Sequence, residues 1–374
     1  HIPFCRSRCI YCGFYSTTLT RLADEYVEAV CTELSGYAKD SWYRRLLEDT
    51  ETVYIGGGTP SQLSPALLSR LFCAIEQTCG LLGKMEVTME CNPDDLTPQF
   101  VKELGRLPVN RVSMGAQTFS DERLRFLHRR HNARQVGEAV ERLRQAGIGN
   151  ISIDLMFGFP GETLEEWEAD IHKALGLQVE HISAYSLMTE EGTELSRMMQ
   201  EGKVKEIDEE LSLRMYQTLI DRLTAAGYEH YEISNFSRPD YHSRHNSSYW
   251  DGTPCIGLGA AAHSYDVDTR WWNVSDVQQY ISRIMKGESA VEEREVLSKA
   301  TRYDDTVMTA LRTSRGLSVE EVEEHFGHEM KDYLMANALP HLQASRLTMD
   351  DGRLRLTREG LFVSDSVMAD LMFV

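Results

Sequence analysis

The feature that most constrains this chain is a group of three cysteines near its start, Cys5, Cys9 and Cys12, spaced C-x3-C-x2-C. Thiolates so close in sequence suit an iron–sulfur cluster or zinc better than a set of disulfides. A closed structural zinc site takes four protein ligands, and ordinary cubane clusters also take four cysteines. Three cysteines therefore predict a four-iron cluster with one iron open to an outside chelating molecule. The alternative is a zinc knuckle that borrows its fourth ligand from His1, Cys31 or Cys91.

The cysteine motif and its surroundings resemble the radical S-adenosylmethionine superfamily. An aromatic residue, Tyr11, directly precedes the third cysteine, and the opening HIPFC resembles the oxygen-independent coproporphyrinogen III oxidase family. The resemblance implies a [4Fe-4S] cluster on the three cysteines, S-adenosylmethionine at the open iron, and Tyr11 packed near its adenine. In that superfamily an electron from the cluster cleaves the sulfonium to give a 5′-deoxyadenosyl radical, so the cofactors carry the difficult chemistry.

Short apolar runs alternate with helical stretches along the first two thirds of the chain, which predicts a parallel α/β sheet. We expect strands at 52–55, 86–90, 111–114, 151–156 and 181–187. We expect helices at 23–38, 64–78, 98–106, 121–146, 163–175 and 207–226. The chain begins at a histidine beside the key motif, so we expect residues upstream and a truncated first strand before Cys5. Counting that strand, the fold class is a partial (β/α)6 barrel, whose sites lie at the carboxyl ends of the strands.

Four further motifs lie at or near these strand ends, and each matches the same superfamily in the same order. They are GGGTP at 56–60, Glu90 before Asn92, Gln117 with Arg129, and Asp154 within an apolar strand. Taken alone, the glycines fit a tight strand exit, Glu90 a surface carboxylate and Asp154 a buried cap of neighbouring backbone. The resemblance implies instead that S-adenosylmethionine contacts Gly57, Gly58, Thr59, Glu90, Gln117, Arg129 and Asp154.

One position departs from the decarboxylating members of the family. Those enzymes carry a further cysteine two residues after the third one, and this chain has Phe14 there. The three cluster ligands are still present, so the substitution does not threaten the cluster. It makes the sequence resemble the sister branch of the family, whose members are heme chaperones.

A second motif, HNxxYW, supports the heme-chaperone branch. Its residues are His245, Asn246, Tyr249 and Trp250. They offer an imidazole as an axial iron ligand, two aromatic rings to pack on a flat macrocycle, and an amide for hydrogen bonding. Outside this family, such a cluster is more often a satisfied core group. His263, in the small-residue segment 255–264, is a second candidate iron ligand.

Composition shifts divide the chain into three expected parts. We expect a radical S-adenosylmethionine barrel domain at 1–235, an extension with the HNxxYW motif at 236–290, and a C-terminal domain at 291–374. A charged stretch near 286–294 marks the last boundary. Beyond it, helices near 301–313, 318–326 and 329–338 and an Asp-Gly hairpin at 346–356 predict a winged-helix-like module.

The charge of the chain restricts its partners. A formal net charge of −19 argues against nucleic-acid binding, because neutralising phosphates requires clustered Lys and Arg, and we reject a DNA-binding role for the winged-helix-like module. No apolar run approaches the length of a membrane-spanning helix. Eight cysteines without a disulfide rhythm predict the reducing cytoplasm.

We therefore expect a heme chaperone that keeps a cluster and an S-adenosylmethionine site. It would bind heme near His245 and pass it to acceptor proteins, including membrane-bound respiratory enzymes, from the cytoplasm or in association with the membrane. The resemblance also allows a homodimer. The alternative is a radical enzyme that decarboxylates coproporphyrinogen III, which requires the same cluster. A zinc-stabilised structural protein is a third, more distant possibility.

Overall fold

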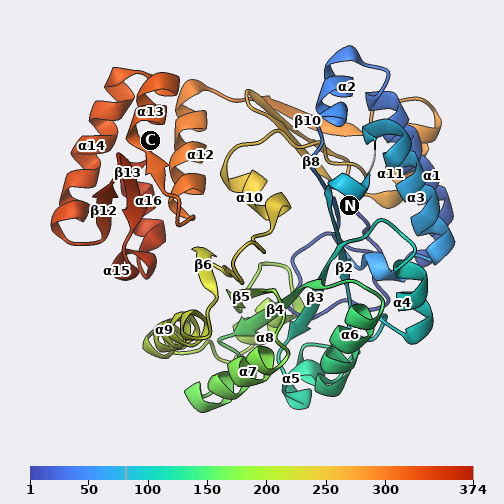
Figure 1. The fold of residues 1–374 in the computed structure, drawn as a ribbon, viewed down its shortest axis with the longest axis horizontal. Coiled ribbons are helices and arrows are strands. Elements are labelled where there is room, and N and C mark those ends of the chain that lie inside the picture. The colour runs from blue at the N-terminus through green and yellow to red at the C-terminus, as the bar shows by residue number, and fades with distance from the viewer. Residues whose placement is uncertain (81, 374) are drawn as a thin grey trace.

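The computed structural model describes residues 1–80 and 82–373, and its central element is a curled seven-stranded sheet (Figure 1). The strands are β1 (Thr52–Ile55), β2 (Glu86–Cys91), β3 (Arg111–Gln117), β4 (Asn150–Phe157), β5 (His181–Ser186), β6 (Glu229–Glu232) and β7 (Asn235–Ser237). They lie in the order β1-β2-β3-β4-β5-β7-β6. β1 to β5 are parallel, and β7 and β6 add two antiparallel strands. The partial α/β barrel expected from the sequence is confirmed.

Helices lie around this sheet, most of them against its outer face (Figure 1). They are α1 (Ala23–Tyr37), α2 (Ser41–Glu48), α3 (Pro65–Cys79), α4 (Pro98–Leu104), α5 (Asp121–Phe126), α6 (Ala133–Gln145), α7 (Leu164–Gly176), α8 (Glu194–Gln200) and α9 (Glu209–Ala225). The expectation of one helix over 121–146 is wrong. The chain turns between α5 and α6, where His128 has φ +59°, and Asn132 begins α6 with a capping box that it forms with Gln135.

The parallel strands have two chemically different faces. The outer face is apolar and packs against helices α3, α4, α6 and α7 through residues such as Val87, Met114 and Ile153. The alternate residues of each strand point to the concave inner face, which we call the lumen face, and many of these residues are polar. Its members include Thr88, Glu90, Arg111, Ser113, Ser152, Asp154, His181 and Ser183, which occupy matching register positions. A polar concave face in a parallel sheet is consistent with a site inside the barrel.

The segment before Cys5 runs beside β1 but forms little of the expected first strand. Ile2 makes an isolated parallel bridge to Gly57, and its N–H donates to the Gly56 carbonyl at 2.7 Å. The Gly58 N–H returns a hydrogen bond to the Ile2 carbonyl at 2.8 Å. These contacts place the cysteine motif next to the carboxyl end of β1.

A second, three-stranded sheet follows the barrel in the order β10-β9-β8. Its strands are β8 (His263–Asp266), β9 (Thr269–Asn273) and β10 (Val291–Val296), and two helices, α10 (Arg244–Trp250) and α11 (Val277–Met285), accompany them. The charged stretch expected near 286–294 as a boundary therefore contains most of a strand that pairs with β9. Exposed charges are typical of an edge strand, which explains why its sequence reads as a linker.

The C-terminal part forms its own apolar core. Its elements are α12 (Lys299–Leu311), β11 (Leu317–Ser318), α13 (Val319–Phe326), α14 (His328–Gln343), β12 (Leu347–Asp350), β13 (Arg353–Leu356), α15 (Arg358–Leu361) and α16 (Ser364–Leu371). The core is built from residues such as Tyr303, Leu334 and Leu354. Helices α12, α13 and α14 and the β12–β13 hairpin give the expected winged-helix-like arrangement, and α15 and α16 follow it. Among the described residues, no helix is both long enough and apolar enough to cross a bilayer.

Candidate functional site

The three cysteines of the N-terminal motif lie on one loop as half-buried free thiols. Within residues 1–80 and 82–373, no three His, Cys, Asp or Glu side chains converge on a point where a single metal ion would bind. A cubane makes a different demand, because each thiolate binds a different iron and the sulfurs need not meet at one point.

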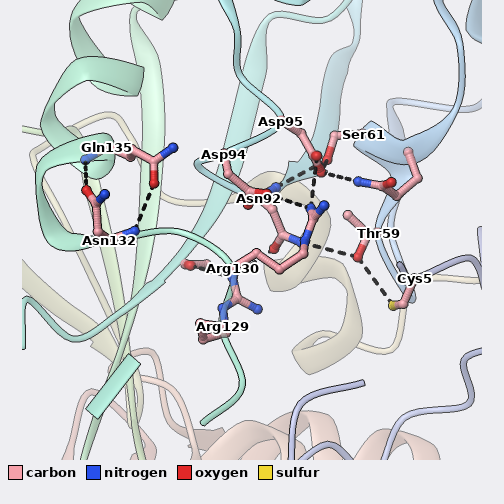
Figure 2. Close-up of polar contacts among 12 residues, drawn as sticks. Cys5, Thr59, Ser61, Asn92, Asp94, Asp95, Arg129, Arg130, Asn132 and Gln135 are labelled. Atoms are coloured by element: carbon pink, nitrogen blue, oxygen red, sulfur yellow. Dashed lines mark hydrogen bonds and ion pairs between the residues drawn. The ribbon is translucent and has the colours of Figure 1, made fainter. Parts of the chain in front are cut away.

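A chain of hydrogen bonds joins Cys5 to Cys9 through the loops after β1 and β2 and the turn between α5 and α6, and Figure 2 shows its part from Cys5 to Arg129. The Cys5 thiol lies 3.3 Å from Thr59 Oγ1, which also accepts from Asn92 Nδ2 at 3.4 Å. Asn92 Oδ1 accepts from Arg129 Nη2 at 2.7 Å. Arg129 Nη1 then donates to Cys9 Sγ at 3.7 Å. A fixed guanidinium that contacts Cys9 of the three-cysteine loop suits an anionic iron–sulfur cluster, so these residues fit the group that the sequence predicts.

The Glu90 side chain lies on the lumen face, next to the loop at 56–60, which we call the glycine loop. Its carboxylate accepts from the Tyr54 hydroxyl at 2.7 Å and from the Gly57 N–H at 3.0 Å. Burial raises the pKa of this carboxyl to about 7, and the two hydrogen bonds only partly offset that effect. A cationic group of a bound ligand would stabilise the ionised form, so this position fits the ammonium of an amino acid moiety.

The glycine loop is also fixed by packing. Gly57 has φ +119°, and a Cβ there would lie 1.9 Å from His1 Cδ2. A Cβ on Gly58 would lie 2.7 Å from the Pro3 carbonyl carbon. Both glycines are therefore required by the close approach of the N-terminal segment, whatever ligand binds beside them.

The remaining predicted contacts to S-adenosylmethionine lie around the same strand ends. Gln117 is buried after an irregularity in β3, with φ +65°. Asp154 accepts from Ser113 Oγ at 3.3 Å, and burial raises its carboxyl pKa to about 6. Tyr11 is half-buried and packs against a small apolar cluster that includes Met156. The structure thus gathers these residues at the carboxyl end of the sheet.

The HNxxYW motif lies on α10, with His245 buried against β1. Its Nδ1 is 2.8 Å from Thr52 Oγ1, and its Nε2 is 2.9 Å from the Tyr249 hydroxyl. The ring stacks on Tyr54 with centroids 4.8 Å apart. Burial lowers the pKa of His245 to about 4, with a smaller contribution from Arg111. Both ring nitrogens are therefore engaged, as in a satisfied core histidine.

A cavity of about 1160 Å³ opens beside α10. Its wall includes His245 and Tyr249 of the motif, Phe14 from the cysteine loop, and Cys255 and His263 from the segment before β8. Asn246 and Trp250 are not among its lining residues. Trp250 instead lies under Arg312 of the C-terminal part, 4.8 Å from ring centroid to guanidinium carbon. The motif is therefore divided: His245 and Tyr249 line the cavity, and Trp250 contacts the C-terminal part.

Comparison with known proteins agrees with this fold. The Radical SAM superfamily matches residues 1–174, and the HemN C-terminal domain matches residues 297–363. These two matches define the class as a radical S-adenosylmethionine protein with a HemN-type C-terminal domain.

The relatives identify the branch. The chain is 35% identical to "Heme chaperone HemW" of Lactococcus lactis over 98% of this chain and 94% of that protein. It is 34% identical to the protein of that name from Bacillus subtilis, over 98% and 96%. The chain belongs to the HemW family. Its fold also matches coproporphyrinogen III oxidase (HemN) of Escherichia coli with a TM-score of 0.84 at 21% identity, covering 100% of this chain and 89% of that one.

Two residues of the site were not assigned from the sequence. Asn92 connects Thr59 to Arg129, and it stands within the Glu90 motif, where only the carboxylate was given a role. Phe14 was noted only as a missing cysteine, yet its side chain is 74% exposed and lines the cavity. An aromatic residue in a loop that carries metal ligands is the signal that could have identified it.

Proposed function

We propose that this chain is a heme chaperone that binds heme in the cavity beside α10 and passes it to acceptor proteins. The cavity carries the proposal. Its volume of about 1160 Å³ is large for a small-molecule site, and imidazole and aromatic side chains stand on its wall. The relatives named as heme chaperones match nearly the whole chain, which supports the same activity.

We assign Cys5, Cys9 and Cys12 to a [4Fe-4S] cluster, which together with S-adenosylmethionine would supply one-electron chemistry when bound. Thr59 orients the Cys5 thiol, and Arg129 holds positive charge beside Cys9. We assign the binding of S-adenosylmethionine to Tyr11, Gly57, Gly58, Thr59, Glu90, Gln117, Arg129 and Asp154. Glu90 would accept the ligand's ammonium group in place of its present hydrogen bonds.

The division into parts at 1–235, 236–290 and 291–374 belongs to the same proposal, since each part would have a separate task. The first holds the cluster, the second supplies the HNxxYW motif of His245, Asn246, Tyr249 and Trp250, and the third docks against it through Arg312. The acceptors would be heme-requiring proteins, including membrane-bound respiratory enzymes reached from the cytoplasm. A homodimer is compatible with this task.

Hemin titration of the anaerobically reconstituted protein tests the proposal. We expect saturable binding with a shifted Soret band, and transfer of the heme to an apo-acceptor such as apomyoglobin. His245→Ala should weaken binding, because it removes a wall residue and frees Tyr249. Absence of saturable binding by the wild-type protein would overturn the proposal.

A coproporphyrinogen III oxidase is the second candidate, supported by the HemN-like fold. Phe14 stands against it, because the decarboxylating branch that the sequence resembles has a cysteine at this position. Reduced protein given coproporphyrinogen III and S-adenosylmethionine should release no protoporphyrinogen IX. Turnover above the level of a Cys9→Ala control would favour the oxidase.

A further inference from the structure

We infer that His263, rather than His245 of the HNxxYW motif, supplies the axial ligand to heme iron in this cavity. The inference rests on the proposed function, because it names the iron ligand of that same site. It follows from comparing the imidazoles on the cavity wall.

Four histidines line the cavity: His1, His242, His245 and His263. His1 Nδ1 is hydrogen-bonded to the Ala260 carbonyl, and His242 Nε2 lies 2.8 Å from Glu229 Oε2. Both nitrogens of the His245 ring have partners in Thr52 and Tyr249. Among the residues that the structure describes, the His263 ring makes no hydrogen bond or ion pair. It is thus the imidazole on this wall in which neither ring nitrogen has a partner among the described residues, whereas His1 and His242 each have one nitrogen engaged. The remaining Nε2 of His1 faces Gly57, since a Cβ on that glycine would lie 2.4 Å from it.

The position of His263 also suits a ligand. It begins β8, where its backbone pairs with Trp272 of β9. The two rings stack with centroids 5.7 Å apart and an interplanar angle of 27°. Stacking restricts the orientation of an otherwise exposed ring, so less conformational entropy is lost when the ring binds iron. The side chain is exposed, which leaves the iron accessible to a competing ligand from an acceptor protein.

Breaking the His245 contacts would be costly by comparison. Iron coordination through Nε2 would displace the Tyr249 hydroxyl, and the ring would remain pinned by Thr52 and by its stack on Tyr54. The ring of His245 is itself buried, so its nitrogens are aimed at these protein partners and away from solvent. His245 is therefore a positioning residue, which holds Tyr249 and α10 against β1.

Two cysteines on the wall, Cys79 and Cys255, could also bind iron. Burial raises the pKa of both thiols, whereas the thiolate is the form that binds metal. The His263 ring, by contrast, is exposed on the cavity wall. The cavity thus offers a histidine-ligated site.

The test is spectroscopy of hemin bound to the full-length wild-type chain and to His263→Ala, His245→Ala and His325→Ala. His325→Ala is the matched control, because it removes an exposed histidine of α13 that is not among the cavity-lining residues. For His263→Ala we expect loss of the imidazole-ligated Soret and electron paramagnetic resonance signals and an affinity lower by about tenfold or more. Free imidazole should restore the spectrum of this variant. His245→Ala should weaken binding but keep the imidazole signature, and His325→Ala should match wild type.

Three results would overturn the inference. An unchanged imidazole spectrum in His263→Ala would remove this residue from the iron. Loss of that spectrum in His245→Ala alone would return the ligand to the HNxxYW motif. A wild-type ferrous–carbonyl spectrum of the thiolate type, abolished by Cys255→Ser, would assign the ligand to the cysteine. Failure of the wild-type chain to bind hemin at all is a separate outcome, since it refutes the proposed function. Circular dichroism verifies that each variant is folded.

Discussion

The side-chain oxygen of Asn92 accepts a 2.7 Å hydrogen bond from the guanidinium of Arg129, and the same amide donates to Thr59 at 3.4 Å (Figure 2). One side chain therefore connects two residues that contact the thiols of Cys5 and Cys9. Asn92→Ala would remove both hydrogen bonds and free the guanidinium to move away from the cluster loop. Because residues around metal ligands orient them, we expect cluster retention to fall by about 10–100-fold.

Iron and sulfide content after anaerobic reconstitution, measured during competition with a chelator, checks this prediction. Asn337→Ala is the control, since Asn337 donates to the Tyr333 carbonyl within α14, in the C-terminal core. Asn92→Asp should give an intermediate result, because it keeps an acceptor for Arg129 and loses the donor to Thr59. Equal cluster retention in Asn92→Ala and wild type would show that Arg129 is held by its other contacts.

The buried carboxyl of Glu90 should make the free energy of unfolding depend on pH when no ligand is bound. Its pKa rises from an ordinary 4.5 to about 7 on folding, so the folded chain binds more protons than the unfolded chain between these values. The stability that this group contributes is present below pH 4.5 and is lost as the pH rises through 7. The loss amounts to about 3 kcal/mol at most, and Glu90→Gln should abolish it.

Unfolding midpoints of the apo-protein at pH 5 and pH 8 test this relation. Glu90→Gln should gain stability relative to wild type at pH 8 and lose affinity for S-adenosylmethionine. Glu25→Gln, a change on an exposed position of α1, serves as the control. If the unfolding midpoint changed with pH by the same amount in wild type and in Glu90→Gln, Glu90 would not be a protonated buried carboxyl in the folded apo-protein.

The sequence predicted the local elements well because their signals are local. The alternation of β1 to β5 with helices follows directly from short apolar runs and caps. The break at His128 was missed, since the cap formed by Asn132 lies within an otherwise helical pattern. Strand β10 was missed because an exposed edge strand carries the charges of a linker.

The part of the site that could be predicted is the part carried by short sequence motifs. The spacing of the cysteines and the residues at strand ends predicted a cofactor site, and the structure brings these residues together at the carboxyl ends of the strands. The surroundings of His245 were not predictable, because its partners Thr52 and Tyr54 lie almost 200 positions earlier and depend on how α10 docks on β1. The free ring of His263 depends in the same way on tertiary packing.

Substitution of Phe14 tests whether heme bound in the cavity reaches the cysteine loop. The side chain is 74% exposed, follows Cys12 by two residues and lines the cavity. An aromatic ring that becomes buried against a porphyrin contributes about 1–2 kcal/mol. Phe14→Ala should therefore weaken hemin binding by about 5–30-fold, whereas Phe14→Tyr should retain it.

Hemin titration with equal cluster content in all three proteins measures this effect. Trp42→Ala is the control, since Trp42 is another exposed aromatic side chain, 55% accessible, and is not among the cavity-lining residues. Equal affinities for Phe14→Ala and wild type would mean that heme does not reach the cluster loop.

Arg312 connects the HNxxYW helix to the C-terminal part. Its Nε and Nη2 donate to Oε1 of the fully buried Glu232 at 3.0 and 2.7 Å, and its guanidinium covers the Trp250 ring. Arg312→Ala would leave the Glu232 carboxylate buried and without its cation, which costs about 3–5 kcal/mol. It would also release Trp250, so α10 should become more mobile.

Hydrogen exchange of α10 and the thermal midpoint, measured together, test this coupling. Arg312→Ala should lower the midpoint and speed exchange in α10, and Arg312→Lys should recover only part of both, because an ammonium lacks the planar fork. Arg315→Ala is the matched control: its ion pair with Glu321 is exposed, and such pairs contribute about 1 kcal/mol or less. If Arg312→Ala destabilised the chain while exchange in α10 stayed at the wild-type rate, Arg312 would stabilise the domain contact without restraining the motif. Faster exchange accompanied by weaker hemin binding would instead mean that docking of the C-terminal part fixes the wall of the cavity.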